Sequence, residues 1–137
     1  MSAPRAFPLR WVSRQERAWN DNAVFEACID LLEHEALAHL SPVQRVAHLA
    51  FHADRSLQVH GWAHFARATP PALRREIATA FEGLGASAQA VWLRAASAGE
   101  PAVSYAQLTP SLEAKLREYL DTHEASFVRE SRPSCTS

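Results

Sequence analysis

Three Ser-Pro or Thr-Pro steps mark positions along the chain where helices can begin. They lie at Ser41-Pro42, Thr69-Pro70 and Thr109-Pro110. Serine and threonine are favoured N-caps, and proline suits the first helical position because it has no N–H to leave unbonded. At the first step, Gln44 follows Ser41 by three residues, which is the spacing of a capping box. Each step therefore predicts the start of a helix.

Apolar residues recur at helical spacing between these steps. We expect helices over residues 22–40, 41–57, 69–81 and 86–96, one from Thr109 to about Phe127, and short ones after Ser13 and Gly61. In the helix of residues 86–96, the inward face is predicted to carry Val91, Trp92 and Ala95. The sequence shows no strand-like alternation and no tandem repeat. The pattern indicates an all-α fold, a single compact helical domain of about five to seven helices.

The length and charge of the chain limit its domain organisation and its partners. The 137 residues suffice for one core, and we expect an N-terminal arm over 1–12, a helical domain over 13–128 and a tail over 129–137. Fourteen basic and fifteen acidic residues give a net charge of -1, which does not favour direct nucleic-acid binding. No signal peptide or membrane-length apolar run is present, so the sequence predicts a cytoplasmic protein without membrane contact.

Four histidines form two pairs with helical spacing. His48 and His52 are four residues apart, as are His60 and His64, so a site of two plus two imidazoles is one interpretation. Arg55 lies on the same side of its helix as the first pair and would repel a cation. We therefore expect structural or surface histidines, no bound metal and no cofactor, with a histidine-dependent metal enzyme as the less favoured alternative.

An acidic stripe lies along the helix predicted over residues 22–40. Glu26, Asp30 and Glu33 follow one another at i, i+4 and i+7, and Leu37 lies beside them at the apolar edge. One interpretation is an ordinary solvated helix face. The functional one is a docking surface for a basic protein partner, in which the charges surround a small apolar contact at Leu37.

The segment of residues 40–127 resembles the bacterial DNA-mimic-protein family, a family that is mostly described as a domain of unknown function. The family pattern is a helix, then an Asn-Gly-Gly-Phe-x-Gln-aromatic turn, then a helix with an Ile-Gly-Ala-like step. The matching turn residues are Gly61, Trp62, His64 and Phe65. The residues 83–86 correspond to the later step, residues 116–127 to the family's close, and Val59-His60 replaces Asn-Gly. The resemblance implies a helical fold and, for an acidic member, occupation of a DNA-binding protein by charge mimicry.

These observations favour a non-catalytic protein-binding module over an enzyme. The sequence contains no local signature of a nucleophilic triad and no glycine-rich phosphate loop. We expect the chain to inhibit or sequester one protein partner, as an immunity-type inhibitor of a toxin. The alternative is a DNA-mimic-type regulator that occupies a DNA-binding protein.

Overall fold

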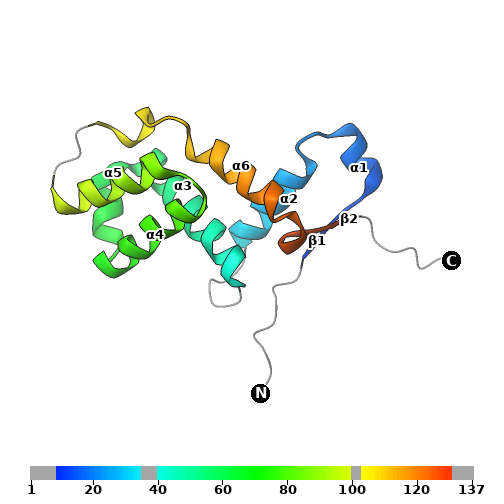
Figure 1. The fold of residues 1–137 in the computed structure, drawn as a ribbon, viewed down its shortest axis with the longest axis horizontal. Helices are drawn as coiled ribbons and strands as arrows, with labels where there is room; N and C mark the ends of the chain where they lie inside the picture. Colours follow the sequence, from blue (N-terminus) through cyan, green and yellow to red (C-terminus); the bar gives the residue numbers. More distant parts are fainter. Residues whose placement is uncertain (1–8, 35–39, 100–102, 131–137) are drawn as a thin grey trace, which may run out of the picture. The chain divides into compact units, whose positions relative to one another are not determined.

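The computed structural model describes residues 9–34, 40–99 and 103–130 (Figure 1). Within these ranges six α-helices carry most of the residues: α1 (Arg14–Trp19), α2 (Ala23–His34), α3 (Pro42–Ala68), α4 (Pro71–Gly83), α5 (Ser87–Ala98) and α6 (Leu112–Thr122). The same ranges contain two 3-10 turns, η2 (Tyr105–Gln107) and η3 (Glu124–Ser126). They also contain two strands, β1 (Arg10–Val12) and β2 (Val128–Glu130). The predicted all-α class is confirmed. No helix in the described ranges is long and apolar enough to cross a bilayer.

The described residues form two compact units. The first contains the residues up to Arg45 and those from Leu120 onward, and the second runs from Val46 to Tyr119. The two boundaries fall inside α3 and α6.

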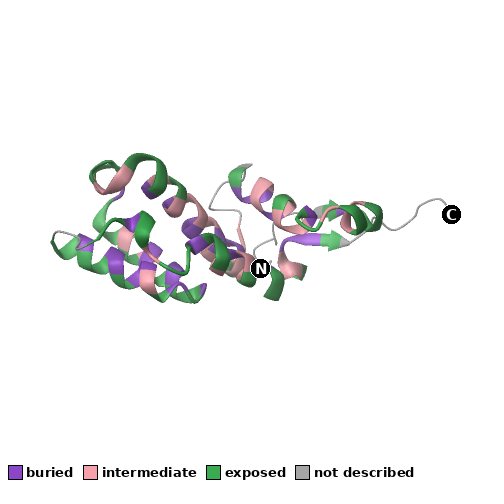
Figure 2. Cartoon of the chain, turned by 90° about the horizontal axis from the view of Figure 1, so that it is seen from above, coloured by how far each residue is buried: buried purple, intermediate pink, exposed green. Residues whose placement is uncertain are grey.

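The first unit contains a small β-sheet that the sequence pattern does not indicate. Strands β1 and β2 pair in parallel, with Trp11 opposite Arg129, and α2 packs against both strands. Its buried residues include Val12, Cys28, Leu31, Leu32, Leu120, Phe127 and Val128. Figure 2 colours the buried parts of the backbone purple. A strand of three residues is too short to show an alternating pattern, and its partner lies at the opposite end of the sequence.

Two of the predicted helix starts form as the sequence indicates. Ser13 Oγ accepts a hydrogen bond from the Glu16 N–H at 3.0 Å and caps α1. At α3, the Ser41 N–H donates to Gln44 Oε1 at 2.9 Å, and the Gln44 N–H donates to Ser41 Oγ at 3.3 Å. The buried Gln44 also donates from Nε2 to the Ser126 carbonyl at 2.7 Å, so the capping box connects α3 to the turn before β2.

The helix starts predicted at the two Thr-Pro steps differ from the prediction. The N-cap of α4 is Pro70, which makes no side-chain hydrogen bond, and Thr69 is buried instead of capping. At α6 the capping oxygen belongs to Ser111, whose Oγ accepts from the Ala114 N–H at 3.2 Å, so Thr109 is not the cap. Both helices begin one or two residues later than the Thr-Pro steps indicate, because proline favours a helix start without fixing which neighbour caps it.

The helix ends also depart from the predicted positions. Helix α2 is described to His34, Leu40 is not helical, and α6 ends at Thr122. Helix α3 continues past Leu57 to a break at Gly61, where φ is 81°. At the end of α4 the left-handed residue is Gly85, with φ 82°, and the Ala86 N–H donates to the Phe81 carbonyl at 2.8 Å. Together with the bond from the Gly85 N–H to the Glu82 carbonyl, this forms a Schellman motif, and α4 ends at Gly83, two residues past the predicted end at Phe81.

The second unit is built around a group of aromatic rings. Helices α4 and α5 pack side by side through a short connection (Figure 1). The Trp92 ring meets the rings of Trp62 and Tyr105 edge-on, at centroid distances of 5.7 and 5.2 Å. Tyr105 in turn stacks against Phe81 at 6.4 Å. The predicted inward position of Trp92 is confirmed, and Phe81 is buried as well.

Candidate functional site

The acidic stripe predicted on α2 is placed in the first unit. Glu26 and Glu33 are exposed and Asp30 is half-buried. Glu26 accepts a hydrogen bond from Asn20 Nδ2 at 3.0 Å, so one member is held by a neighbouring side chain. Leu37, the apolar member of the predicted surface, lies outside the described residues. The docking role of the stripe stays a prediction.

The histidines are brought together as two ring pairs. The His48 and His52 ring centroids are 4.3 Å apart, and those of His60 and His64 are 4.4 Å apart. His52, His60 and His64 line one shallow depression of about 550 Å³ together with Arg55. In the described part of the chain, no three His, Cys, Asp or Glu side chains are arranged to hold a metal ion. The guanidinium of Arg55 gives this depression positive charge.

The residues that match the family turn lie around the break in α3. Gly61 supplies the break itself, with φ 81° and ψ 177°. Phe65 is buried, and the Trp62 ring lies 6.0 Å from that of Phe65 and packs toward Trp92. His64 is exposed beside His60. Gly61 therefore has a backbone role and the two aromatic residues have a packing role in this structure.

The half-buried Asp54 and the buried Tyr105 form a pair in the second unit. The Tyr105 hydroxyl donates to Asp54 Oδ1 at 2.7 Å. Burial raises the pKa of both groups, and the Asp54 carboxylate raises that of Tyr105 further. The phenol therefore stays protonated and acts as a donor, which makes the pair a structural connection between α3 and η2.

An apolar groove runs along α5, and the sequence prediction missed it. It has a volume of about 520 Å³ and is lined by Ser87, Ala88, Val91, Trp92, Ala95, Val103 and Leu108. Val91 is 65% exposed and Val103 is 47% exposed, which is high for valines in a folded chain. Ser87 is the one polar side chain of this lining. The groove therefore offers an apolar surface to a partner.

Two part-buried hydrogen bonds hold the outer wall of this groove against α5. The Trp92 indole N–H donates to the Val103 carbonyl at 2.7 Å, and Gln89 Nε2 donates to the Pro110 carbonyl at 2.8 Å. Between these anchors, Ser104 and Gln107 form a capping box around η2, which positions Leu108. The wall is therefore built from a fixed backbone, and the indole N–H is not available to a ligand.

The groove exists because α5 buries a different face from the predicted one. Trp92 is buried as expected, but its buried neighbours are Gln89, Leu93 and Ala96, whereas Val91 and Ala95 are exposed. Val91 and Leu93 lie about 200° apart on a helix, so burying the larger leucine turns the valine outward. The predicted inward position of Val91 and Ala95 is wrong for this reason. The small residues at positions 87, 88 and 95 are the sequence signal that could have indicated this exposed face of α5.

No family model matches the chain, and no curated protein or solved structure matches it. The resemblance to the DNA-mimic-protein family therefore stays a prediction.

Proposed function

We propose that the chain is a non-catalytic protein-binding module that inhibits or sequesters one protein partner, and that the α5 groove is its contact surface. The observation that carries this proposal is the exposure of Val91 and Val103 in one apolar hollow with a fixed wall. Apolar surface left in water on a small domain is a common mark of an interaction site, because covering it is favourable.

The occupant that fits the groove is an apolar helix of the partner. Ala88, Val91 and Ala95 repeat at intervals of three and four residues and so form one face of α5. Small side chains on such a face let a second helix approach closely, while Val103 and Leu108 close the other side. Helix-in-groove binding of this kind places apolar anchors at i, i+3 or i+4 and i+7 of the partner.

Inhibition of a toxin, in the manner of immunity proteins, is the role that we favour. Sequestration of a DNA-binding protein by charge mimicry needs an extended array of charges with phosphate spacing. The stripe of Glu26, Asp30 and Glu33 is short, and the whole chain has a net charge of only -1. The acidic stripe is better suited to steering a basic partner into contact.

The test is capture of the partner from the native cell, followed by affinity measurement with two matched variants. Val91→Glu places a carboxylate in the groove, and Val59→Glu places one at a valine of similar exposure, 68%, outside it. An unpaired charge in a dry interface costs several kcal/mol, so Val91→Glu should weaken binding by about a hundredfold or more. Val59→Glu should bind as the wild type does.

The same experiment separates the alternatives. Equal affinity of the Val91→Glu variant and the wild type would place the interface outside the groove. Identification of the captured protein as a toxin or as a DNA-binding protein decides between immunity and DNA mimicry. Loss of a catalytic activity of the partner upon binding would support inhibition.

A further inference from the structure

A second hollow in the same unit is lined by arginines. It lies between α4 and α5, has a volume of about 390 Å³, and its lining includes Arg74, Arg75, Arg94, Pro71 and Leu93. None of its lining residues belongs to the lining of the α5 groove. The surrounding sequence is basic as well, since no Asp or Glu occurs from Arg55 through Arg75.

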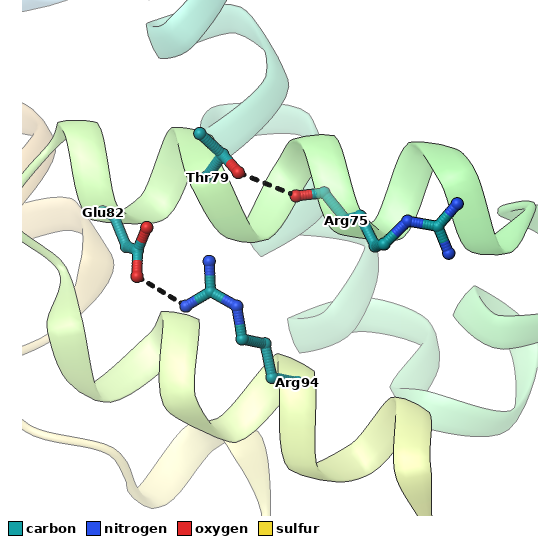
Figure 3. A network of polar contacts seen from close by, with 4 residues as sticks. All are labelled: Arg75, Thr79, Glu82 and Arg94. Atoms are coloured by element: carbon teal, nitrogen blue, oxygen red, sulfur yellow. Dashed lines mark hydrogen bonds and ion pairs between the residues drawn. The ribbon is translucent and has the colours of Figure 1, made fainter.

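The three arginines differ in how far their charge is already used. Arg74 Nε is buried without a hydrogen-bond partner, and the Arg74 guanidinium lies over the Trp62 ring, 5.6 Å from its centroid. The Arg75 guanidinium makes no hydrogen bond or ion pair with any residue that the structure describes. Arg94 pairs with Glu82 across the two helices, as Figure 3 shows. The Arg75 charge is therefore available to an anion, Arg74 has one buried donor without a hydrogen-bond partner, and the Arg94 charge is shared with one carboxylate.

The start of α4 adds backbone donors at the same place. Pro71, the first residue of the helix, lines the hollow, and the N-cap Pro70 offers no side-chain acceptor. The first backbone bond of the helix is donated by the Arg74 N–H to the Pro70 carbonyl, which leaves the N–H groups of Ala72 and Leu73 at the open end. Such groups attract negative charge.

We propose that the hollow between α4 and α5 binds a phosphate group, with Arg74 and Arg75 as its ligands. Arg94 is a third ligand, and the Glu82 carboxylate competes with the phosphate for it. A tetrahedral dianion with several acceptor oxygens suits a hollow that is lined by arginine side chains of two helices. The apolar part of the lining, Leu93 and Pro71, would contact the organic group of a phosphate monoester. This inference does not depend on the groove or on its protein partner.

Calorimetric titration of the full chain with inorganic phosphate and with phenyl phosphate at low ionic strength tests the proposal. We expect both to bind, and Arg75→Gln to weaken binding by about tenfold, as expected for loss of a charge-assisted hydrogen bond. Arg67→Gln is the matched control, because Arg67 is an exposed arginine of α3 outside the lining. Tighter binding of phenyl phosphate would assign the site to an organic phosphate, and equal binding would assign it to the free ion.

A second pair of variants provides a gain of affinity, which misfolding cannot produce. Glu82→Gln removes the carboxylate that competes for Arg94 and should tighten phosphate binding by about two- to fivefold. Glu113→Gln removes an equal charge from an exposed pair with Arg117 and should change nothing. Absence of binding by both probes, or equal effects of Arg75→Gln and Arg67→Gln, would overturn the proposal. Equal effects of Glu82→Gln and Glu113→Gln would also overturn it, because the change in phosphate affinity would then come from the change in net charge alone.

Discussion

Gly61 is the residue whose backbone departs furthest from what other amino acids adopt. Its φ of 81° and ψ of 177° fall in a region that is essentially restricted to glycine. A Cβ added there would meet no atom within 4 Å, so the cost of a side chain comes from the backbone alone. We expect Gly61→Ala to lower the free energy of unfolding by about 1–3 kcal/mol.

Denaturant unfolding of two alanine variants measures this cost. Gly99 is the control, because its φ of 177° is extended and its Cβ position is also open. Gly99→Ala should change stability little. Equal stability of Gly61→Ala and the wild type would show that the break in α3 does not need glycine.

Asp54 gives the protein a defined pH dependence. Burial raises the pKa of its carboxyl group above the ordinary value of 3.8, while hydrogen bonds from Tyr105 and Gln58 oppose the rise. Since the folded pKa is the higher one, the stability contributed by Asp54 is fully present below pH 3.8 and is lost as the pH rises through the folded pKa. Asparagine keeps an acceptor for the Tyr105 hydroxyl and does not ionise. We expect Asp54→Asn to remove this loss and to be at least as stable as the wild type at neutral pH.

Unfolding curves at a series of pH values, from acid to neutral, measure the difference between Asp54→Asn and the wild type. The exposed Asp21→Asn variant is the control and should follow the wild-type profile. A constant difference between Asp54→Asn and the wild type across the series would contradict the predicted role of the Asp54 charge.

At the scale of single elements, α2 carries the charge that is predicted to steer a partner. Reversing the stripe with Glu26→Lys, Asp30→Lys and Glu33→Lys should lower the association rate constant by on the order of tenfold at low salt, because rim charges act mainly on encounter. The salt dependence of binding should weaken as well. Stopped-flow association with the captured partner measures both.

A reversal of two carboxylates on another helix, against three in the stripe, controls for net charge. Glu113→Lys and Glu118→Lys lie on exposed positions of α6 in the second unit. Unchanged rates and unchanged salt dependence in the α2 variant would place the interface elsewhere. Circular dichroism of each variant verifies that the helices remain, since Asp30 is half-buried.

At the scale of the whole molecule, each compact unit has its own core, and Cys28 reports on the first. Burial, together with the nearby carboxylates of Glu124 and Asp121, raises the pKa of its thiol to about 12. The thiolate is the reactive form, so the folded unit should protect Cys28 from alkylation. In a Cys135→Ser variant, we expect iodoacetamide at mildly alkaline pH to modify Cys28 only as fast as this unit opens. Modification at the rate of a free thiol in native conditions would contradict the burial of Cys28.

The positions of the helices can be predicted from the amino-acid sequence alone. Helix formation depends on neighbours three and four residues apart and on caps such as Ser13 and the pair of Ser41 and Gln44, so the signal is local and readable. The positive φ of Gly61 was predictable for the same reason, because the glycine interrupts an otherwise helical pattern. The stripe of α2 also follows from spacing alone.

Which surfaces these helices bury, and which they leave exposed, depends on tertiary packing. Strand β1 forms because residues from the far end of the chain pair with it, and no local pattern encodes that contact. Helix α5 turned Leu93 inward and Val91 outward, which created the groove. The arginines of α4 and α5 line one hollow only because the two helices pack side by side. Helical periodicity leaves the choice between neighbouring arcs open, and that choice is made by the volumes that the rest of the core must fill.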